Sequence, residues 1–442
     1  MNELDTLSDL VRRARAAGAD AADGVIVSAT SVSVQRRLRK TEQVTRSEGH
    51  DLGLRVFVGQ RSASVSSSAV DPAGFDALVA RAIAMARIVP EDPYAGLAAE
   101  ARSPTGLDLQ MDDGREPDVD ALIARASAAE EAALSVAGIT NSEGADAGFA
   151  RARIALVTSA GFAGQTARSS HSVSATALAG DGTGMERDYD YSSTVHLDDL
   201  EDPATIGRIA GEKAVARLNP TRPKTMRVPV IYDPRVSSSI LGHLSSAING
   251  SSIARGTSFL KERMGQQVFA RGVTIIDDPR RVRGLRSREF DGEGVPTRVA
   301  SIIDDGVLTT WFLDSRTARQ LGLQTTGSAS RGVNGPPSPS ATNLYMAAGT
   351  MTPQALMADI KEGLYITEMM GSSINGITGD YSRGASGFMI RDGALAEPVA
   401  EITVAGSLPE MFMHLTPAND LRFRRGTDAP TVRIEGLTLA GS

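Results

Sequence analysis

Apolar residues alternate with polar or small residues over much of the N-terminal part of the chain, and this period of two is the strongest constraint on the fold. From 52 to 58 every second residue is Leu or Val, and from 62 to 66 serine alternates with Ala or Val. Successive side chains of a strand point to opposite faces, so this pattern buries one face and leaves the other wet. Together with the alternating valines at 25–34, it predicts an antiparallel meander over residues 22–68.

Helical periodicity frames this meander. Leu4, Leu7, Leu10 and Val11 share one helix face, and a second apolar stripe runs from 75 to 86 after Asp71-Pro72, a typical helix start. Weaker patterns predict further elements: helices at 117–137 and 202–217, and strands at 149–158, 165–178 and 189–197.

Hairpin chemistry is concentrated in the second half. Asp304-Asp305-Gly306 and Arg391-Asp392-Gly393 each separate two apolar runs. Asp-Gly pairs supply the positive φ that tight hairpin turns require, so these carboxylates are interpreted as turn residues and not as a catalytic pair. Residues 327–340 form a long, small and polar loop, which predicts a mobile or functional segment.

Asn219-Pro220-Thr221-Arg222-Pro223 is the best candidate for a domain boundary, because the residue before each proline is pushed out of the helical region. We therefore predict an α+β fold with two domains. Residues 1–222 form a mixed α/β domain with an antiparallel sheet, and residues 223–442 form a strand-rich, barrel-like domain with helices.

Cysteine and histidine counts exclude whole classes of chemistry. The chain has no Cys and five His, the closest pair lying 25 residues apart. Disulfides, thiolate nucleophiles, Cys-bearing zinc sites and HExxH helices are thereby excluded. A net charge of -7 and only 4% aromatic residues give no surface for nucleic acid. The N-terminus lacks the pattern of a signal peptide and no apolar run reaches about 18 residues, so we expect a cytoplasmic protein with no membrane role.

A strand–helix unit begins at Val228. Asp233-Pro234 is a good helix start, and Val236, Ile240, Leu244 and Ile248 recur every four residues as one apolar stripe. A polar turn follows, with Asn249, Ser251 and Arg255 in it. Local chemistry alone assigns no catalytic power to this unit.

At this point the sequence resembles a known family. The segment HLSSAINGSSIARGTSFLKERMG (243–265) is similar to the corresponding stretch of the TldD/PmbA family, the modulators of DNA gyrase, and most similar to its PmbA (TldE) branch. The resemblance spans nearly the whole chain in order, through the further segments RSEGHDLGLRVFVGQRSASVSSS (46–68), DGEGVPTR (291–298), GVNGPPSPSATNLYMAAGT (332–350) and GLYITEMMGSSINGITGDYSRGASGFMI (363–390).

The resemblance implies a heteromeric metallopeptidase whose TldD-type subunit carries an HExxxH helix and a later Cys as metal site. Aligned on Arg255-Gly256-Thr257-Ser258, the two His positions fall on Leu241 and Ser246, and the Glu falls on Gly242. The Cys has no counterpart in this chain. The expectation is a chain without catalytic residues, metal site or cofactor of its own, with a zinc-type divalent metal in the partner; whether the chain is itself an enzyme stays open.

Such a subunit would pair with a TldD-type catalytic subunit, and the complex would cleave unfolded or small peptides and process peptide precursors. An extended peptide substrate would bind by adding a strand to a sheet. His243, Asn249, Ser251 and Arg255 are then candidates for facing the partner or the substrate; the alternative is that Asn249 and Ser251 cap a turn. Two other readings are a homodimeric peptide-binding protein with no peptidase role and a metal-free hydrolase using Ser or carboxylate chemistry. The gyrase label implies no binding of nucleic acid.

Overall fold

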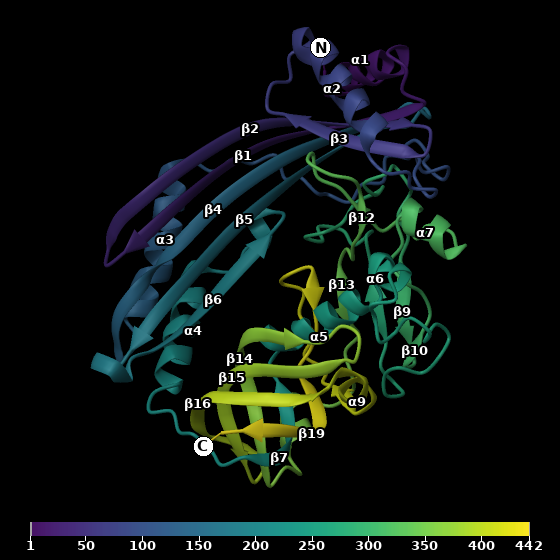
Figure 1. The fold of residues 1–442 in the computed structure, drawn as a ribbon. Helices are drawn as coiled ribbons and strands as arrows, with labels where there is room; N and C mark the ends of the chain where they lie inside the picture. Colours follow the sequence, from purple (N-terminus) through teal and green to yellow (C-terminus); the bar gives the residue numbers. More distant parts are fainter. Residues whose placement is uncertain (1, 442) are drawn as a thin grey trace.

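The structure is a computed structural model that describes residues 2–441. Its N-terminal half is dominated by one long, curved, six-stranded sheet (Figure 1). All neighbours in this sheet are antiparallel, in the order β3-β2-β1-β4-β5-β6. The strands are β1 Ala21–Arg37, β2 Lys40–Val58, β3 Arg61–Ser67, β4 Ile139–Thr158, β5 Ala163–Ala179 and β6 Glu186–Thr194.

The predicted meander over 22–68 is confirmed as β1, β2 and β3. β1 and β2 pair from Ala21↔Phe57 to Arg37↔Lys40, and the tight turn between them places Leu38 and Arg39 at positive φ. Leu52, Leu54 and Val56 are fully buried, as the alternation requires.

One strand is much longer than its sequence predicts. We expected a strand from 149, but β4 begins at Ile139. The early part carries Gly144 and the small residues Ala145 and Ala147, and the pairing with β5 shifts register twice before Gly144. Small side chains and these irregularities hide the period of two, so this prediction was wrong by ten residues.

Four helices cover a single face of the sheet: α1 Glu3–Ala16, α2 Phe75–Ile88, α3 Val119–Leu134 and α4 Pro203–Ala216. Ile26 of β1 lies in the core that α1 and α2 form, while Val32 and Val34 of the same strand lie in the core under α3 and α4. Even-numbered residues of one strand share a face, so both helix pairs pack on the same, outer side (Figure 1).

The opposite face of the sheet meets the C-terminal half. Val25 and Leu156, on the inner side of β1 and β4, pack with Phe162 and with Phe290 from the second half of the chain. Phe162 and Phe290 meet edge to face at 5.1 Å between ring centroids. The inner face therefore contacts the C-terminal half at the end of the sheet whose outer face is covered by α1 and α2. We call the contact between the long sheet and the C-terminal half the joint.

The C-terminal half contains a closed five-stranded barrel. β7 pairs with β14 and β19, β15 lies between β14 and β16, and the pairing of β16 with β19 closes the ring. β17 extends β19 at one side. The strands are β7 Met226–Tyr232, β14 Glu362–Ile374, β15 Asp380–Arg391, β16 Ala394–Ser407, β17 Leu415–Pro417 and β19 Val432–Ala440.

A second, smaller sheet lies beside the barrel in the order β10-β9-β8-β13-β18. Its strands are β8 Ile275–Asp277, β9 Ala300–Asp304, β10 Val307–Leu308, β13 Leu344–Met346 and β18 Thr427–Asp428, and β11 Ala329–Ser330 pairs with β12 Ser338–Pro339 nearby. The helices of this half are α5 Pro234–Ala247, α6 Gly250–Ala254, α7 Ser315–Leu321, α8 Pro353–Met357 and α9 Leu408–Met413.

The predicted α+β class and the barrel-like C-terminal part are confirmed. α4, the last helix on the long sheet, ends at Ala216, and the first barrel strand begins at Met226; the division at 222/223 stays a prediction. Both predicted turns are confirmed, because Asp305-Gly306 joins β9 to β10, and Asp392-Gly393 joins β15 to β16, with positive φ at all four residues. Within residues 2–441, no helix is long and apolar enough to cross a membrane.

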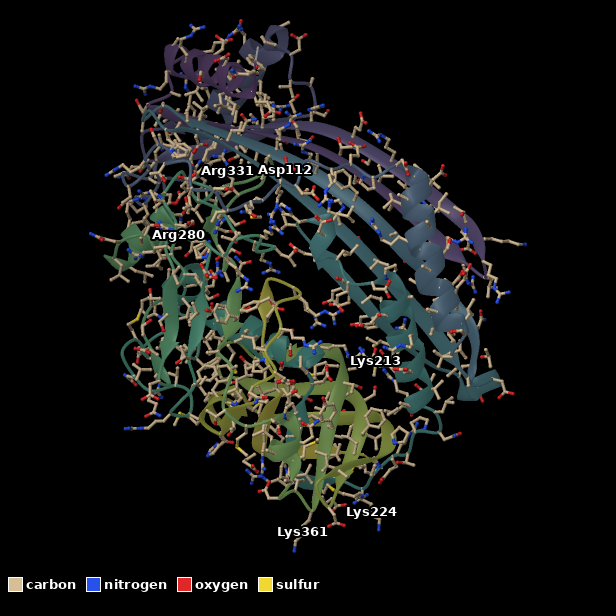
Figure 2. All side chains as sticks on the ribbon, turned by 180° about the vertical axis from the view of Figure 1, so that it is seen from behind. Asp112, Lys213, Lys224, Arg280, Arg331 and Lys361 are labelled. Atoms are coloured by element: carbon tan, nitrogen blue, oxygen red, sulfur yellow. The ribbon has the colours of Figure 1, made fainter. Side chains whose placement is uncertain are left out.

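The loop at 327–340 is an anchor between the two halves. Val333 lies so close to Gly53 of β2 that a Cβ there would stand 2.4 Å from the Val333 carbonyl oxygen. Arg331, 2% exposed in its side chain, forms an ion pair of 2.5 Å with Asp23 of β1, beneath the long sheet (Figure 2). Asp23 also accepts hydrogen bonds from Arg55 of β2.

Two carboxylates in this buried region, Asp23 and Glu293, have pKa values shifted in opposite directions. Burial raises the pKa of Asp23, but Arg331 and Arg55 outweigh it and hold that pKa below its ordinary value. Glu293, 4% exposed, accepts from the Ser315 backbone N–H at 2.8 Å. Burial and then the negative charge of Asp291 raise the pKa of Glu293 to about 7.

Glu293 makes folding stability depend on pH. Its ordinary pKa of 4.5 rises to about 7 in the folded chain, so the native state holds a proton that the unfolded state has released. The proton bound to Glu293 therefore stabilises the folded chain. This contribution is complete below pH 4.5 and is lost as pH rises through 7, and its full size is about 3 kcal/mol. The free energy of unfolding of the wild type relative to Glu293→Gln, measured by urea titration, should fall by this amount from acid to mildly basic pH. Glu42→Gln, at an exposed position, is the control, and a pH-independent difference for Glu293→Gln would contradict the prediction.

Candidate functional site

Helix α5 carries the positions that the family resemblance singled out. Asp233 caps it by accepting from the Arg235 N–H, and Pro234 occupies its first turn. Its predicted apolar stripe is confirmed, since Val236, Ile240 and Leu244 are buried in the large C-terminal core.

The three aligned metal-site positions lie in different surroundings. Leu241 is fully buried in the same core, whereas Gly242 and Ser246 are exposed. The Ser246 hydroxyl donates to the Gly242 carbonyl oxygen at 2.9 Å, within the helix itself. Positions five residues apart on a helix differ by about 140°, which places Leu241 toward the core and Ser246 toward the surface.

His243 packs against the barrel. Its ring meets Tyr381 of β15 edge to face, with 5.8 Å between centroids. Burial and the positive charge of Arg383 lower the pKa of His243 to about 4, so the ring is neutral near pH 7. Its Nε2 is buried and has no hydrogen-bond partner among the described residues. The Tyr381 hydroxyl in turn lies 3.4 Å from that of Tyr232.

The other three candidates lie around α6. Asn249 caps this helix by accepting from the Ser251 N–H at 2.9 Å, and its amide donates to the Pro339 carbonyl at 2.8 Å. Ser251 is half-buried in the first turn of α6, and Arg255 is exposed at its end. Asn249 therefore has the capping role that the alternative interpretation proposed, and that Ser251 and Arg255 face a partner or substrate stays a prediction.

An open groove of about 760 Å³ lies next to this helix pair. The end of β14, the turn after it and the start of β15 form most of its wall, and Thr257 closes one side. The turn is docked on the α6 side, because Phe259 donates its N–H to the Gly376 carbonyl at 3.0 Å. Tyr381 belongs to the groove wall, so His243 contacts a wall residue through its ring. In the sequence this hairpin stood out only as part of the family resemblance. Its Asn375-Gly376 pair is a local sign of a turn and could have located it.

Groups of side chains that could bind a metal ion are absent from the described part of the chain. Over residues 2–441, no three side chains of His, Asp or Glu are grouped so that they could hold a metal ion.

A charge network joins the long sheet, α5 and the barrel, and sequence reasoning missed it. Asp188 of β6, 3% exposed in its side chain, accepts from Arg235 of α5 at 2.5 Å. Arg217 reaches the same carboxylate at 3.4 Å and Glu368 of β14 at 2.6 Å. Lys213, labelled in Figure 2, adds a contact of 3.3 Å to Asp190. These partners lie far apart in sequence, so no local pattern reveals them.

The comparisons with known proteins agree with this architecture. Three family domains match in succession: PmbA/TldA metallopeptidase domain 1 over residues 22–86, the central domain over 112–218 and the C-terminal domain over 225–441. The metalloprotease PmbA of Escherichia coli O157:H7 is 34% identical over 425 residues, which cover 96% of this chain and 92% of that protein. A metalloprotease PmbA homolog of Haemophilus influenzae is 33% identical over 439 residues, covering 99% and 95%.

A solved structure shares the whole fold. It is that of a candidate modulator of DNA gyrase from Bacteroides thetaiotaomicron, with a TM-score of 0.90 and 27% identity over 99% of this chain and 98% of that one. The chain is thus an α+β protein of the metallopeptidase-related class. It belongs to the PmbA/TldD family, as its sequence indicated.

The Asp188 network yields a stability prediction. Burial raises the pKa of Asp188, but the hydrogen bond and charge of Arg235 outweigh it and hold that pKa below its ordinary value. Asp188→Asn would leave Arg235 and Arg217 without their shared counter-charge, at a cost of about 3–5 kcal/mol in the free energy of unfolding. Glu143→Gln, which breaks the exposed pair with Arg187, should cost less than about 1 kcal/mol. Equal losses in urea titrations of the two variants would show that the network does not hold the joint.

Proposed function

We propose that this chain is the metal-free, PmbA/TldE-type subunit of a cytoplasmic TldD/TldE-like metallopeptidase complex. The catalytic zinc-type metal belongs to a TldD-type partner, and the complex cleaves unfolded or small peptides, including peptide precursors. The observation that carries the proposal is the state of α5: Leu241 is a core residue, Gly242 has no side chain, and Ser246 is bonded within its own helix. The chain also has no Cys to complete a metal site.

The packing of Leu241 makes this state hard to reverse. A buried leucine contributes roughly 2–5 kcal/mol through its contacts and the cavity that it fills. A histidine in its place would bring a polar ring into an apolar core, and a metal ion bound to that ring would also have to lie in the core. Helix α5 is thus built as a packing element between the barrel and its neighbours.

The groove beside α5 suits an extended peptide in chemical terms. It is open, and its wall consists of the ends of two strands and the turn between them. Main-chain hydrogen bonds with weak sequence selectivity are the expected mode of binding. In this proposal His243 supports the wall through Tyr381, and Arg255 and Ser251 lie toward the partner or the substrate.

Co-expression with the TldD-type chain tests the proposal. Unfolded casein and short peptides are incubated with each chain alone and with the co-purified pair, with and without chelator. We expect chelator-sensitive cleavage by the pair, and none by this chain alone. Size measurement by light scattering accompanies the assay. Robust, chelator-sensitive cleavage by this chain alone would refute the proposal, and a stable homodimer that ignores the partner would favour a peptide-binding protein.

Restoring the missing ligands gives a sharper prediction. The triple variant Leu241→His, Gly242→Glu, Ser246→His should gain neither bound zinc nor peptide cleavage, because its first imidazole points into the core. Its free energy of unfolding should fall by about 2–5 kcal/mol. Ser246→His alone, at an exposed position, should change stability by less than about 0.5 kcal/mol. Stoichiometric zinc in the triple variant, measured by elemental analysis, would show that α5 still supports a metal site.

A further inference from the structure

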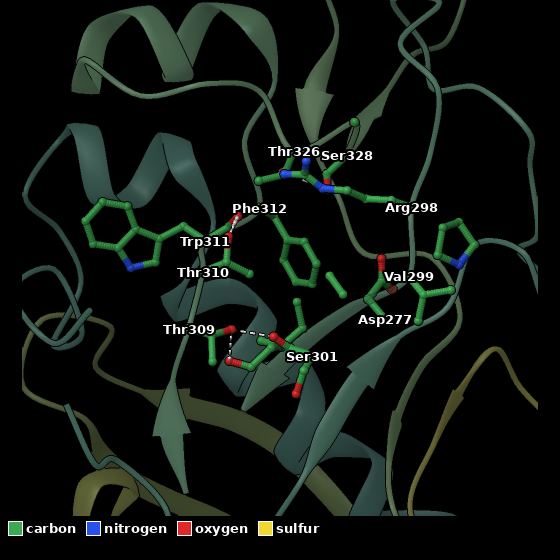
Figure 3. Close-up of a pocket in the computed structure, with 14 residues that line it drawn as sticks. Asp277, Arg298, Val299, Ser301, Thr309, Thr310, Trp311, Phe312, Thr326 and Ser328 are labelled. Carbon is green, nitrogen blue, oxygen red and sulfur yellow. Dashed lines mark hydrogen bonds between the residues drawn. The ribbon is translucent and has the colours of Figure 1, made fainter. Parts of the chain in front are cut away.

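A second cavity, of about 240 Å³, lies between β8, β9 and the segment around Phe312 (Figure 3). It is distinct from the groove beside α5, and none of its lining residues is shared with that groove. Pockets for drug-sized ligands span about 300–1,000 Å³, so this cavity suits a smaller molecule or a chain end.

One wall of the cavity carries a free positive charge. Arg298 is exposed at the mouth, and no carboxylate of the described residues 2–441 pairs with it. The segment before it is firmly held: Asp291 accepts from the N–H groups of Glu293 and Val295, and the hydroxyl of Thr297 donates to the Arg288 carbonyl at 2.6 Å. A rigid segment thus presents an uncommitted guanidinium.

Hydroxyl groups extend this side of the cavity. Figure 3 shows the Arg298 side chain running toward Thr326 and Ser328. The Ser328 hydroxyl lies 2.9 Å from Thr326 Oγ1, which also lies 3.2 Å from the Leu313 carbonyl oxygen, so Ser328 adds a hydroxyl group to this wall. A guanidinium and a hydroxyl donor side by side are a fitting pair for a carboxylate.

A buried negative group lies on another side. Asp277, 4% exposed, accepts from the Thr342 N–H at 2.7 Å through Oδ1 and lines the cavity. In the view of Figure 3, Asp277 and the Phe312 ring both lie below Thr326 and Ser328, and Phe312 contributes apolar lining. A buried carboxylate with an oxygen to spare is a site for a cation or a strong donor.

We propose that this cavity binds a short zwitterion, a free dipeptide or amino acid, with its carboxylate on Arg298 and Ser328 and its ammonium on Asp277. Among residues 2–441 neither Arg298 nor Asp277 forms an ion pair, although the charge of Arg288 acts on Asp277. The apolar floor of Phe312 and Ile302 selects small aliphatic side chains. The inference goes beyond the proposed function and does not require the chain to be part of a peptidase, although peptide hydrolysis releases ligands of this class.

Calorimetry on the isolated full-length chain tests the site with L-alanyl-L-alanine as probe. Free L-alanine, N-acetyl-L-alanyl-L-alanine and L-alanyl-L-alaninamide are the comparison ligands, of which the last two each lack one charge. We expect saturable binding of a free zwitterion, dipeptide or amino acid, and at least about tenfold weaker binding of both blocked forms.

Two variants assign the charges. Arg298→Gln should bind L-alanyl-L-alanine and L-alanyl-L-alaninamide equally, while it still binds the N-acetylated dipeptide more weakly. Asp277→Asn should bind L-alanyl-L-alanine and its N-acetylated form equally, while it still binds the amide more weakly. Arg271→Gln, an exposed arginine outside the cavity, should match the wild type. Absence of binding up to about 10 mM, or equal binding of free and blocked dipeptides by the wild type, would overturn the proposal. Because Arg298 is exposed, its variant keeps the test decisive even where Asp277→Asn fails to fold.

Discussion

The joint between the long sheet and the C-terminal half depends on charges that are buried on both sides. Asp23 and Asp188 lie on strands of the N-terminal sheet, and each is nearly inaccessible to solvent. Each has one counter-charge from its own half, Arg55 or Arg217, and one from the other half, Arg331 or Arg235. Separating the two halves would remove one of the two guanidinium groups from each buried carboxylate, which lowers the stability of the joint. Both ion pairs, together with the contact between Phe162 and Phe290, join the curved sheet to the C-terminal half.

Local patterns made part of this structure predictable. The meander, the apolar stripe of α5 and the two Asp-Gly turns were readable because period two, period four and positive φ are properties of neighbouring residues. β4 was predicted too short because Ala145 and Ala147 are small enough to hide the alternation. The joint was invisible because Asp188 and Arg235, or Asp23 and Arg331, meet only after the chain has folded. The interpretation of 327–340 as a mobile or functional loop missed its anchoring role for the same reason.

The candidate site shows the same division. The resemblance located α5 and its three aligned positions, and the capping role of Asn249 was open to local reasoning. The groove wall and the contact between His243 and Tyr381 needed three-dimensional placement, because β15 lies far along the chain from α5. Arg298 lies in a quoted family segment, yet nothing in that segment indicates that it faces a cavity with Asp277.

Helix α5 also shows which of the three aligned positions is constrained by packing. At Gly242 the space above the backbone is open, with no atom within 4 Å of a Cβ built there, and Ser246 is exposed. Neither position forbids a larger side chain. The constraint lies at Leu241, whose contacts help to hold the helix against the barrel and the small sheet. Of the three positions, the one that packs is therefore the one that ties α5 most tightly to its present role, because changing it sacrifices stability that the other two do not provide.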